Sequence, residues 1–381
     1  MAPKKKDAKK SADPGVCIST RFFFSRAFAT CELTRVSHAV AASFRAYTGE
    51  DVGLLQSTAF VKKGYPTACE SYGLTPLALQ LDRGEEGVSP FLHLAVHPGL
   101  AGKTKEGLPD PKAPMPTPTH CRALLEALLP YTFLVRLAFW SVPVKDDGCA
   151  AIASYLVSNK SLTSLDITDA GVSRNGCKVL GEALERNSTL VTLRLDHNRG
   201  VTADGVACLG ESLLRNTALS TLSLTYCGLE GPEAAYPIPN GLFRAPMLRV
   251  IELKGNRFGA DGVLILLGAL KACTSVFRVD LADTGWGGEK EVHAALEECF
   301  QQNTTCHEYA IGHNPIGDSI IYRWLGMVKR LPHLIFVDVT NRCDPLLFKQ
   351  IGDACAANKK DWLKRMKKKG GKKGKGGKKK K

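Results

Sequence analysis

A repeated sequence pattern constrains the fold of this chain more than any other feature. Residues 162–187, LTSLDITDAGVSRNGCKVLGEALERN, and residues 190–216, LVTLRLDHNRGVTADGVACLGESLLRN, share nearly the same arrangement of apolar and polar residues. The common pattern is LxxLxLxxN, followed about a dozen residues later by GxxxLxxAL. A period of this length predicts a stack of similar units. The pattern can be placed eight times at intervals of 28 to 30 residues, with its first position on Leu134, Leu162, Leu190, Leu219, Leu248, Val276, Cys306 and Leu334.

Each half of the unit predicts one type of secondary structure. Leu193 and Leu195 alternate with polar residues, which is typical of a strand with one buried face. In 205–216, GVACLGESLLRN, apolar residues recur at steps of three and four, which is typical of a helix with one buried stripe. Neither half can bury its apolar side alone, so each unit must stack on its neighbours. We number the positions of the unit from its first leucine, and we expect positions 1, 4 and 6 to lie in the core.

Asparagine recurs at position 9 of the unit, at Asn198, Asn256 and Asn314. An amide there can pair with backbone groups where the strand bends into the loop, and an unpaired backbone group would cost roughly 1–3 kcal/mol. These features together resemble the leucine-rich repeat family, and the period with a full helix resembles its ribonuclease-inhibitor class. The resemblance covers about residues 121–361. It implies an α/β fold: a leucine-rich repeat solenoid, or horseshoe, of about eight repeats, with parallel strands on the concave face and helices on the convex face.

The remaining chain divides into three segments. Residues 1–30 are expected to form a basic, poorly ordered N-terminal segment, and 16–30, which lacks acidic residues, could be a targeting segment. Residues 31–120 are expected to be a partly helical capping region with a proline-rich loop, and 120–131 resembles the helix of a preceding, partly lost unit. Residues 362–381 are expected to be a disordered Lys/Gly tail.

The positive charge of the chain belongs to its ends. The formal net charge is +14, of which residues 359–381 contribute +13 and residues 1–13 contribute +3, leaving about −2 for the middle. Thirteen cysteines without a CxxC pair indicate reduced, buried thiols, which fits a cytoplasmic protein. We expect the tail to bind an acidic polymer such as tubulin tails, RNA or an anionic surface, through Lys367, Lys368, Lys369, Lys372, Lys373, Lys375, Lys378, Lys379, Lys380 and Lys381.

Catalytic, metal and cofactor motifs are weak. Gly102-Lys103-Thr104 follows an apolar strand, but His97 replaces the first glycine of a phosphate-binding loop and prolines replace its helix. Metal-ligand spacing is lacking among the candidates His293, Cys299, Cys306, His307 and His313. We therefore predict a protein that is not an enzyme, with no cofactor, no metal and no small-molecule substrate.

The repeat pattern indicates which side chains form the concave surface. If positions 1, 4 and 6 are buried, positions 3, 5 and 7 face the concave side, because side chains alternate along a strand. These positions hold six acidic and four basic residues, with an aromatic residue near each end. Aromatic residues and arginine dominate protein interfaces. The predicted partner-binding residues are Arg136, Trp140, Asp166, Arg194, Asp196, Glu252, Lys254, Arg278, Asp280, Glu308, Phe336 and Asp338, with Arg278, Asp280, Glu252 and Lys254 as the first choice of anchor.

The sequence leaves three functions open. The first is a scaffold that binds a protein partner on the concave face while its basic tails bind an acidic surface, with the cytoskeleton of a cilium or flagellum (the axoneme) as its suggested place in the cell. The second is a GTPase-activating protein of the Ran type, although that family carries an acidic tail and this tail is basic. The third is an adaptor associated with RNA or the ribosome. No apolar run is long enough to predict a transmembrane segment.

Overall fold

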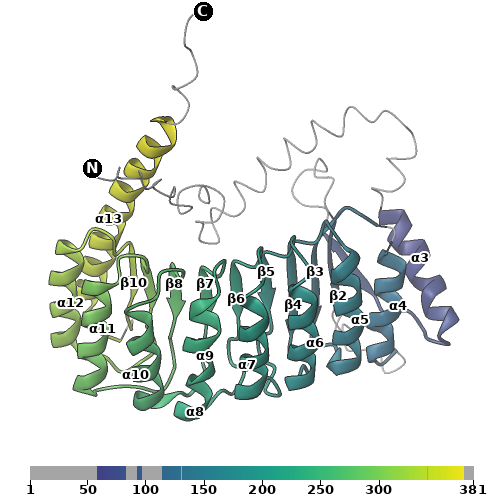
Figure 1. The fold of residues 1–381 in the computed structure, drawn as a ribbon, viewed down its shortest axis with the longest axis horizontal. Helices are drawn as coiled ribbons and strands as arrows, with labels where there is room; N and C mark the ends of the chain where they lie inside the picture. Colours follow the sequence, from purple (N-terminus) through teal and green to yellow (C-terminus); the bar gives the residue numbers. More distant parts are fainter. Residues whose placement is uncertain (1–57, 83–91, 97–113, 130, 341, 373–381) are drawn as a thin grey trace, which may run out of the picture.

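A single ten-stranded sheet forms the backbone of the molecule, and its strands follow one another in chain order (Figure 1). The computed structural model describes residues 58–82, 92–96, 114–129, 131–340 and 342–372. β1 pairs antiparallel with β2, and all later neighbours pair in parallel. The strands are β1 (Leu79–Asp82), β2 (Leu92–Val96), β3 (Leu134–Trp140), β4 (Ser164–Thr168), β5 (Thr192–Arg194), β6 (Thr221–Ser223), β7 (Val250–Glu252), β8 (Arg278–Asp280), β9 (Glu308–Ala310) and β10 (Phe336–Asp338).

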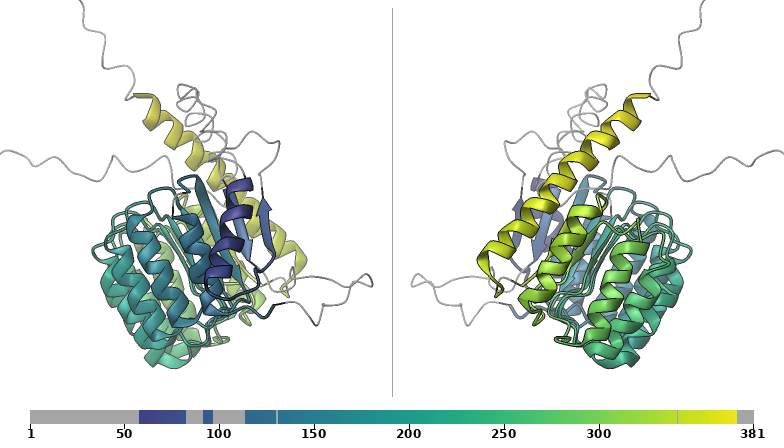
Figure 2. Two further views of the ribbon diagram at one scale, coloured as in Figure 1. Left: turned by 90° about the vertical axis from the view of Figure 1, so that its right-hand side faces the viewer. Right: turned by 90° about the vertical axis from the view of Figure 1, so that its left-hand side faces the viewer.

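Helices connect the parallel strands and cover one side of the sheet (Figures 1 and 2). This alternation confirms the predicted α/β solenoid. Where the fourth unit would have one helix, α8, α9 and a short 3-10 helix replace it, because prolines at 232, 237 and 239 interrupt regular hydrogen bonding. The helices are α3 (Thr58–Ser71), α4 (Pro118–Leu128), α5 (Lys145–Ser158), α6 (Arg174–Leu184), α7 (Thr202–Leu213), α8 (Gly231–Ala235), α9 (Pro237–Asn240), η4 (Leu242–Arg244), α10 (Gly259–Leu270), α11 (Lys290–Gln302), α12 (Asp318–Arg330) and α13 (Pro345–Lys372).

The register of the sheet follows the repeat. Position 3 of each unit lies beside position 3 of the next, from Arg136 and Ser164 at one end to Glu308 and Phe336 at the other. The residues at positions 1, 4 and 6 of all eight units are buried, as predicted. Stacking therefore converts eight short apolar patterns into one continuous core.

The position-9 asparagines make the predicted backbone contacts. Asn198 donates from Nδ2 to the carbonyl oxygens of Ile167 (2.7 Å) and Leu195 (3.0 Å), and its Oδ1 accepts from the N–H groups of Ala170 (2.9 Å) and Val172 (3.1 Å). Asn256 and Asn314 bind the equivalent groups of their own units. Each amide ties two consecutive units together.

A second row of asparagines, which was not predicted, lies at the other ends of the strands, just before each strand begins. Asn187 lies three residues before position 1, donates to the carbonyl oxygen of Leu156 (2.7 Å) and accepts from the N–H groups of Thr189 (2.9 Å) and Leu190 (2.8 Å). Asn216 and Asn303 repeat these contacts. The signal was present in the sequence, since both end their helices as RN or QN.

The sheet begins before the eight predicted units. β2 pairs in parallel with β3, and α4 lies between them in the chain, so β2 and α4 supply one further strand and helix. α3 packs on α4, and β1 covers the outer edge of β2. The described part of 31–120 thus contains α3, the antiparallel pair β1 and β2, and the first residues of α4.

α13 closes the other end of the solenoid and continues past residue 361 to Lys372, whereas a disordered tail was predicted from 362 (Figure 2). It packs against its preceding strand, β10, and against α12. Asn358 donates to the carbonyl oxygens of Val328, Leu331 and Leu334, in the manner of the second asparagine row. The helix then continues instead of turning into another strand. Trp362 packs on Phe277 and His307, with ring centroids 5.9 Å apart in both pairs.

None of the described helices combines the length and the apolar composition that crossing a lipid bilayer requires.

Candidate functional site

Positions 3, 5 and 7 place the predicted partner-binding residues on the side of strands β3 to β10 that faces away from the connecting helices. Most of them are half-buried, and Arg136 and Trp140 at the first of these strands are exposed. Asp166 accepts a hydrogen bond from Thr168 two residues later on the same strand. The strand register therefore assembles side chains from residues some 200 positions apart in the sequence into one row.

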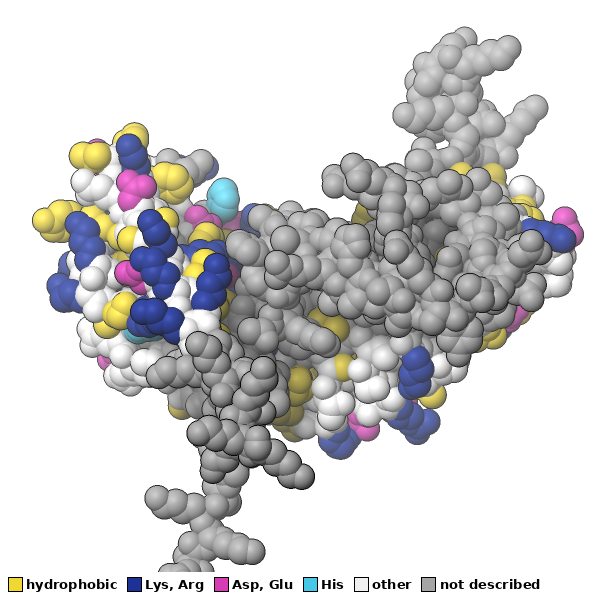
Figure 3. Space-filling model, turned by 90° about the horizontal axis from the view of Figure 1, so that it is seen from above, with side chains coloured by type: hydrophobic (Ala, Val, Ile, Leu, Met, Phe, Trp, Pro, Cys, Tyr) yellow, Lys and Arg dark blue, Asp and Glu magenta, His cyan; other side chains and the backbone are white. Residues whose placement is uncertain are grey.

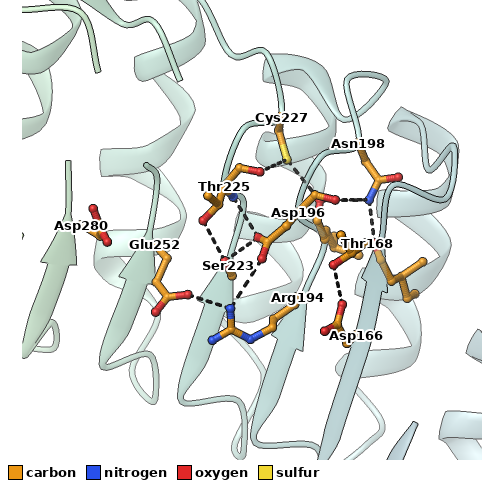
Figure 4. Close-up of polar contacts among 12 residues, drawn as sticks. Asp166, Thr168, Arg194, Asp196, Asn198, Ser223, Thr225, Cys227, Glu252 and Asp280 are labelled. Atoms are coloured by element: carbon orange, nitrogen blue, oxygen red, sulfur yellow. Dashed lines mark hydrogen bonds and ion pairs between the residues drawn. The ribbon is translucent and has the colours of Figure 1, made fainter. Parts of the chain in front are cut away.

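An ion-pair cluster centred on Arg194 spans three strands of this row (Figure 4). Arg194 Nη1 lies 3.1 Å from Glu252 Oε2 on β7 and 3.5 Å from Asp196 Oδ2 on its own unit. The side chain passes over β6, where Ser223 is small enough to leave room, and Ser223 Oγ donates to Asp196. The backbone N–H of Thr225 also donates to Asp196, at 2.9 Å. The neighbours of Arg194 therefore fix its guanidinium in place.

A second cluster centres on Arg278. Its guanidinium lies 3.3 Å from Glu308 on β9, 4.0 Å from Asp280 and 5.3 Å from the centre of the Phe336 ring on β10. Lys359 of α13 reaches Glu308 from the other side at 3.9 Å. The predicted anchor of Arg278, Asp280, Glu252 and Lys254 thus lies on adjacent strands, but Glu252 pairs with Arg194.

Burial changes the roles of some predicted residues. Glu308 is 6% exposed because Arg278 and Lys359 cover it, so it positions these cations and does not itself face a partner. Burial also raises the pKa of Asp280, and its neighbour Glu252 raises it further. Burial raises the pKa of Asp338 as well. These carboxylates lie in a partly desolvated cleft, where a cationic partner group would interact strongly.

A groove of about 1070 Å³ runs along the loops that follow the strands, and it was not predicted from the sequence. Many of its lining residues are at position 8 of the unit, and in the described units the residues at this position all have left-handed backbone conformations. The rings of His197 and Tyr226 stack with centroids 5.2 Å apart, and Tyr226 Oη donates to Asp283 Oδ2 at 3.1 Å. The Tyr226 ring lies across Gly255, where any side chain would clash with it. The groove is lined by Ser141, Thr168, Asp169, His197, Arg199, Tyr226, Gly228, Glu230, Gly255, Arg257 and Asp283.

Two arginines at position 10 supply exposed cations to the groove. Arg199 lies against Gly228 of the next unit, and Arg257 lies against Gly285. Neither forms an ion pair with any residue that the structure describes. The alternation of glycine and arginine at 171, 199, 228, 257 and 285 was the sequence signal for this feature.

The candidate metal ligands do not form a cluster, and the candidate phosphate-binding loop lies outside the described residues. His293 packs between Trp286 and Trp324, Cys299 and Cys306 are buried, and His313 is exposed on a loop. Within the described ranges, no three His, Cys, Asp or Glu side chains are grouped so that they could hold a metal ion. Gly102-Lys103-Thr104 falls outside the described residues, as do the targeting candidate 16–30 and the tail from Lys373 to Lys381.

The basic residues of α13 mark the C-terminal end of the solenoid (Figure 3). Lys360, Lys364, Lys367 and Lys368 are exposed, and their spacing places them on one side of the helix. Lys369 and Lys372 belong to the last turns of the same helix. Part of the predicted polyanion-binding segment is therefore a helix and not a disordered chain.

Comparison with known proteins agrees with this architecture. A family model described as leucine-rich repeat matches residues 158–181 and 186–210, which are two consecutive units of the solenoid. The matched units are leucine-rich repeats. No curated protein matches its sequence.

Two solved structures are similar to part of this chain. Actin-binding site 2 of leiomodin-1 is 26% identical, over 34% of this chain and 73% of that one, with a TM-score of 0.30. The C-terminal domain of tropomodulin from Caenorhabditis elegans is 14% identical, over 34% of this chain and 77% of that one, with a TM-score of 0.29. Similarity at these TM-scores establishes no shared function.

Proposed function

We propose that this leucine-rich repeat protein is a non-enzymatic scaffold that binds a protein partner with its concave face and the adjoining loop groove. The observation that carries the proposal is the Arg194 cluster, in which the guanidinium is fixed 3.1 Å from Glu252 before any partner arrives. Side chains that are already ordered lose little conformational entropy on binding. Concave sheets of stacked repeats commonly serve as extended binding surfaces.

The loop groove supports the same proposal with residue types that dominate interfaces. Tyr226 is 37% exposed, and Arg199 and Arg257 are exposed on either side of it. Arginine and tyrosine are enriched among the residues that contribute most to binding. The fixed clusters of the concave face and the free arginines of the groove together form one continuous candidate surface.

A comparison of two double charge reversals tests this surface. Arg199→Glu with Arg257→Glu changes the groove, and Arg186→Glu with Lys329→Glu changes exposed residues near the ends of the convex helices, which makes it a matched control. In proximity labelling in cells, we expect the proteins that the unchanged chain labels most strongly to remain unlabelled by the groove variant and to be labelled by the control variant. Equal labelling by both variants would exclude the groove as the binding surface.

We further propose that the basic C-terminal segment attaches the scaffold to the acidic tails of tubulin, with the axoneme as the suggested site. The support is chemical: residues 359–381 carry fourteen Lys or Arg and one Asp, and glycine lets the charges follow an irregular acidic chain. The segment has one aromatic residue, Trp362, and that residue packs on the solenoid, so base stacking gains little from it.

Co-sedimentation with microtubules tests the second part. We expect the full chain to bind intact microtubules and to lose most of its binding after subtilisin removes the tubulin tails. Actin filaments and RNA serve as competitors, and stronger binding to either would overturn the tubulin proposal.

A single-turnover GTP hydrolysis assay with Ran is expected to show no acceleration, whereas acceleration would favour the Ran-type alternative.

A further inference from the structure

An apolar hollow of about 290 Å³ lies between β10 and α13, at the end of the concave face. In the other units a helix is followed by a strand that pairs with the one before it, but α13 continues as a helix and leaves the outer edge of β10 without a strand neighbour among the described residues. The residues that line the hollow are Ile335, Phe336, Val337, Asp338, Val339, Phe348, Ile351, Gly352, Cys355, Ala356 and Lys359.

Small residues on α13 keep the hollow open. Gly352 and Ala356 are one helical turn apart and both are exposed, so the helix presents no more than a methyl group at these two positions. Phe348, one turn earlier, is 42% exposed although it is large and apolar. An exposed aromatic residue beside an unfilled apolar hollow indicates a binding site more than a solvated surface.

The opposite wall of the hollow is rigid. Phe336 stands at position 3 of β10, and the guanidinium of Arg278 lies 5.3 Å from its ring centre. Arg278 is in turn held by Glu308, which also contacts Lys359 of α13. The hollow therefore lies next to the Arg278 cluster of the concave face, and its Phe336 wall is already in place without a rearrangement.

A carboxylate without a direct ion pair lies at the rim. Asp338 forms no ion pair with any described residue, although His313, Arg278 and Lys254 are near enough to oppose the burial that raises its pKa. Its carboxylate lies over Gly312, 3.0 Å from where a side chain at that position would begin. Lys359 at the other rim already faces Glu308. A half-buried carboxylate without a cation in direct contact is destabilising, so an incoming positive charge would be favoured at Asp338.

We propose that this hollow binds an extended segment of a partner protein by inserting one aromatic or large aliphatic side chain between Phe336 and Phe348 while an adjacent Lys or Arg pairs with Asp338. The inference rests on the proposed scaffold function and specifies the partner's chemistry at one end of the concave face. It predicts a short motif in which a bulky apolar residue stands next to a basic one.

Short peptides test the chemistry of the hollow on the full chain. We expect acetyl-Phe-Arg-amide to bind at least about tenfold more tightly than acetyl-Phe-Glu-amide or acetyl-Ala-Arg-amide, as measured by NMR titration. Ala356→Phe should abolish this binding by filling the hollow, whereas Ala357→Phe, an exposed neighbour outside the hollow, should leave it unchanged. Asp338→Asn should remove the preference for Arg over Glu. Equal effects of the two alanine variants, or an unchanged preference in Asp338→Asn, would overturn the proposal.

A crosslink identifies the occupant in cells. Phe348 is replaced by p-benzoylphenylalanine, which keeps an aromatic side chain at the hollow, and the cells are irradiated. Crosslinks to another protein through an apolar-basic segment support the proposal. Crosslinks confined to the chain itself or to a second copy of it would overturn it. If the peptides fail to bind while the groove variant still loses its partners, the hollow is excluded and the scaffold function stands.

Discussion

At the scale of single residues, the fold depends on side chains that complete the backbone hydrogen bonds of their neighbours. Asn198 makes this clear, because its amide serves carbonyl and N–H groups from two units while it is almost fully buried. The sequence predicted this role from the recurrence of asparagine at position 9. It did not predict the partners on the preceding unit, because those depend on how closely the units stack.

Replacing Asn198 with alanine should destabilise the solenoid strongly. The N–H groups of Ala170 and Val172 would lose their acceptor in the core, so we expect the free energy of unfolding to fall by about 2–4 kcal/mol. Asn175→Ala, at an exposed position of α6, is the control and should change it by less than about 0.5 kcal/mol. Urea unfolding of both variants provides the measurement, and similar midpoints would contradict the role of the amide.

His307 should make the C-terminal end sensitive to acid. Burial, assisted by the nearby His333 and Arg365, lowers the pKa of His307 from 6.5 to about 4. The folded state therefore holds this ring neutral at a pH where the unfolded state already binds a proton. Stability is therefore complete above about pH 6.5 and falls as the pH drops from there to about 4. His307→Gln should flatten this part of the pH profile, which Trp fluorescence during urea unfolding can follow. An unchanged profile would contradict the assignment.

At the scale of elements, α13 shows where the sequence was least informative. A disordered Lys/Gly tail was predicted from residue 362, yet the helix continues to Lys372. Trp362 packs on Phe277 and His307, and Arg365 donates to the carbonyl oxygen of Pro332 at 3.2 Å. These contacts lie between residues far apart in the chain, and composition alone cannot show them. The left-handed backbone that shapes the loop groove was equally hidden, because most position-8 residues are not glycine.

Removing the Trp362 side chain should release the end of α13. We expect Trp362→Ala to raise amide hydrogen exchange in 359–368 by at least about tenfold, because few other contacts hold this segment, while α12 exchanges as before. Lys360→Ala is the matched control, since its side chain is exposed on the same turn. Unchanged exchange in the Trp362 variant would mean that helix propensity alone maintains this segment.

At the scale of the whole molecule, the eight-fold pattern was sufficient to predict the solenoid and its buried positions. It was not sufficient to predict that Arg194 pairs with Glu252 across the intervening β6, since the pairing depends on the small Ser223 between them. The residues of the concave row were thus found from the sequence, whereas their pairing and the adjoining groove came from the structure.

The two proposed binding regions should differ in their response to salt. Microtubule binding through 359–381 should weaken at least about tenfold between about 50 mM and about 200 mM salt, because the segment carries fourteen Lys or Arg. Partner binding should change less, since Arg194 and Arg278 are already neutralised by carboxylates and the groove adds two arginines, Arg199 and Arg257. Titrations at several salt concentrations measure both slopes, and equal slopes would contradict the division of roles.

The central claim is that the strands and their following loops, and not the helices, hold the partner. Hydrogen–deuterium exchange of the full chain, with and without a partner recovered by proximity labelling, tests it most directly. We predict protection at 192–199, 221–230 and 250–257, with α6, α7 and α10 unchanged. Protection confined to those helices would contradict the account.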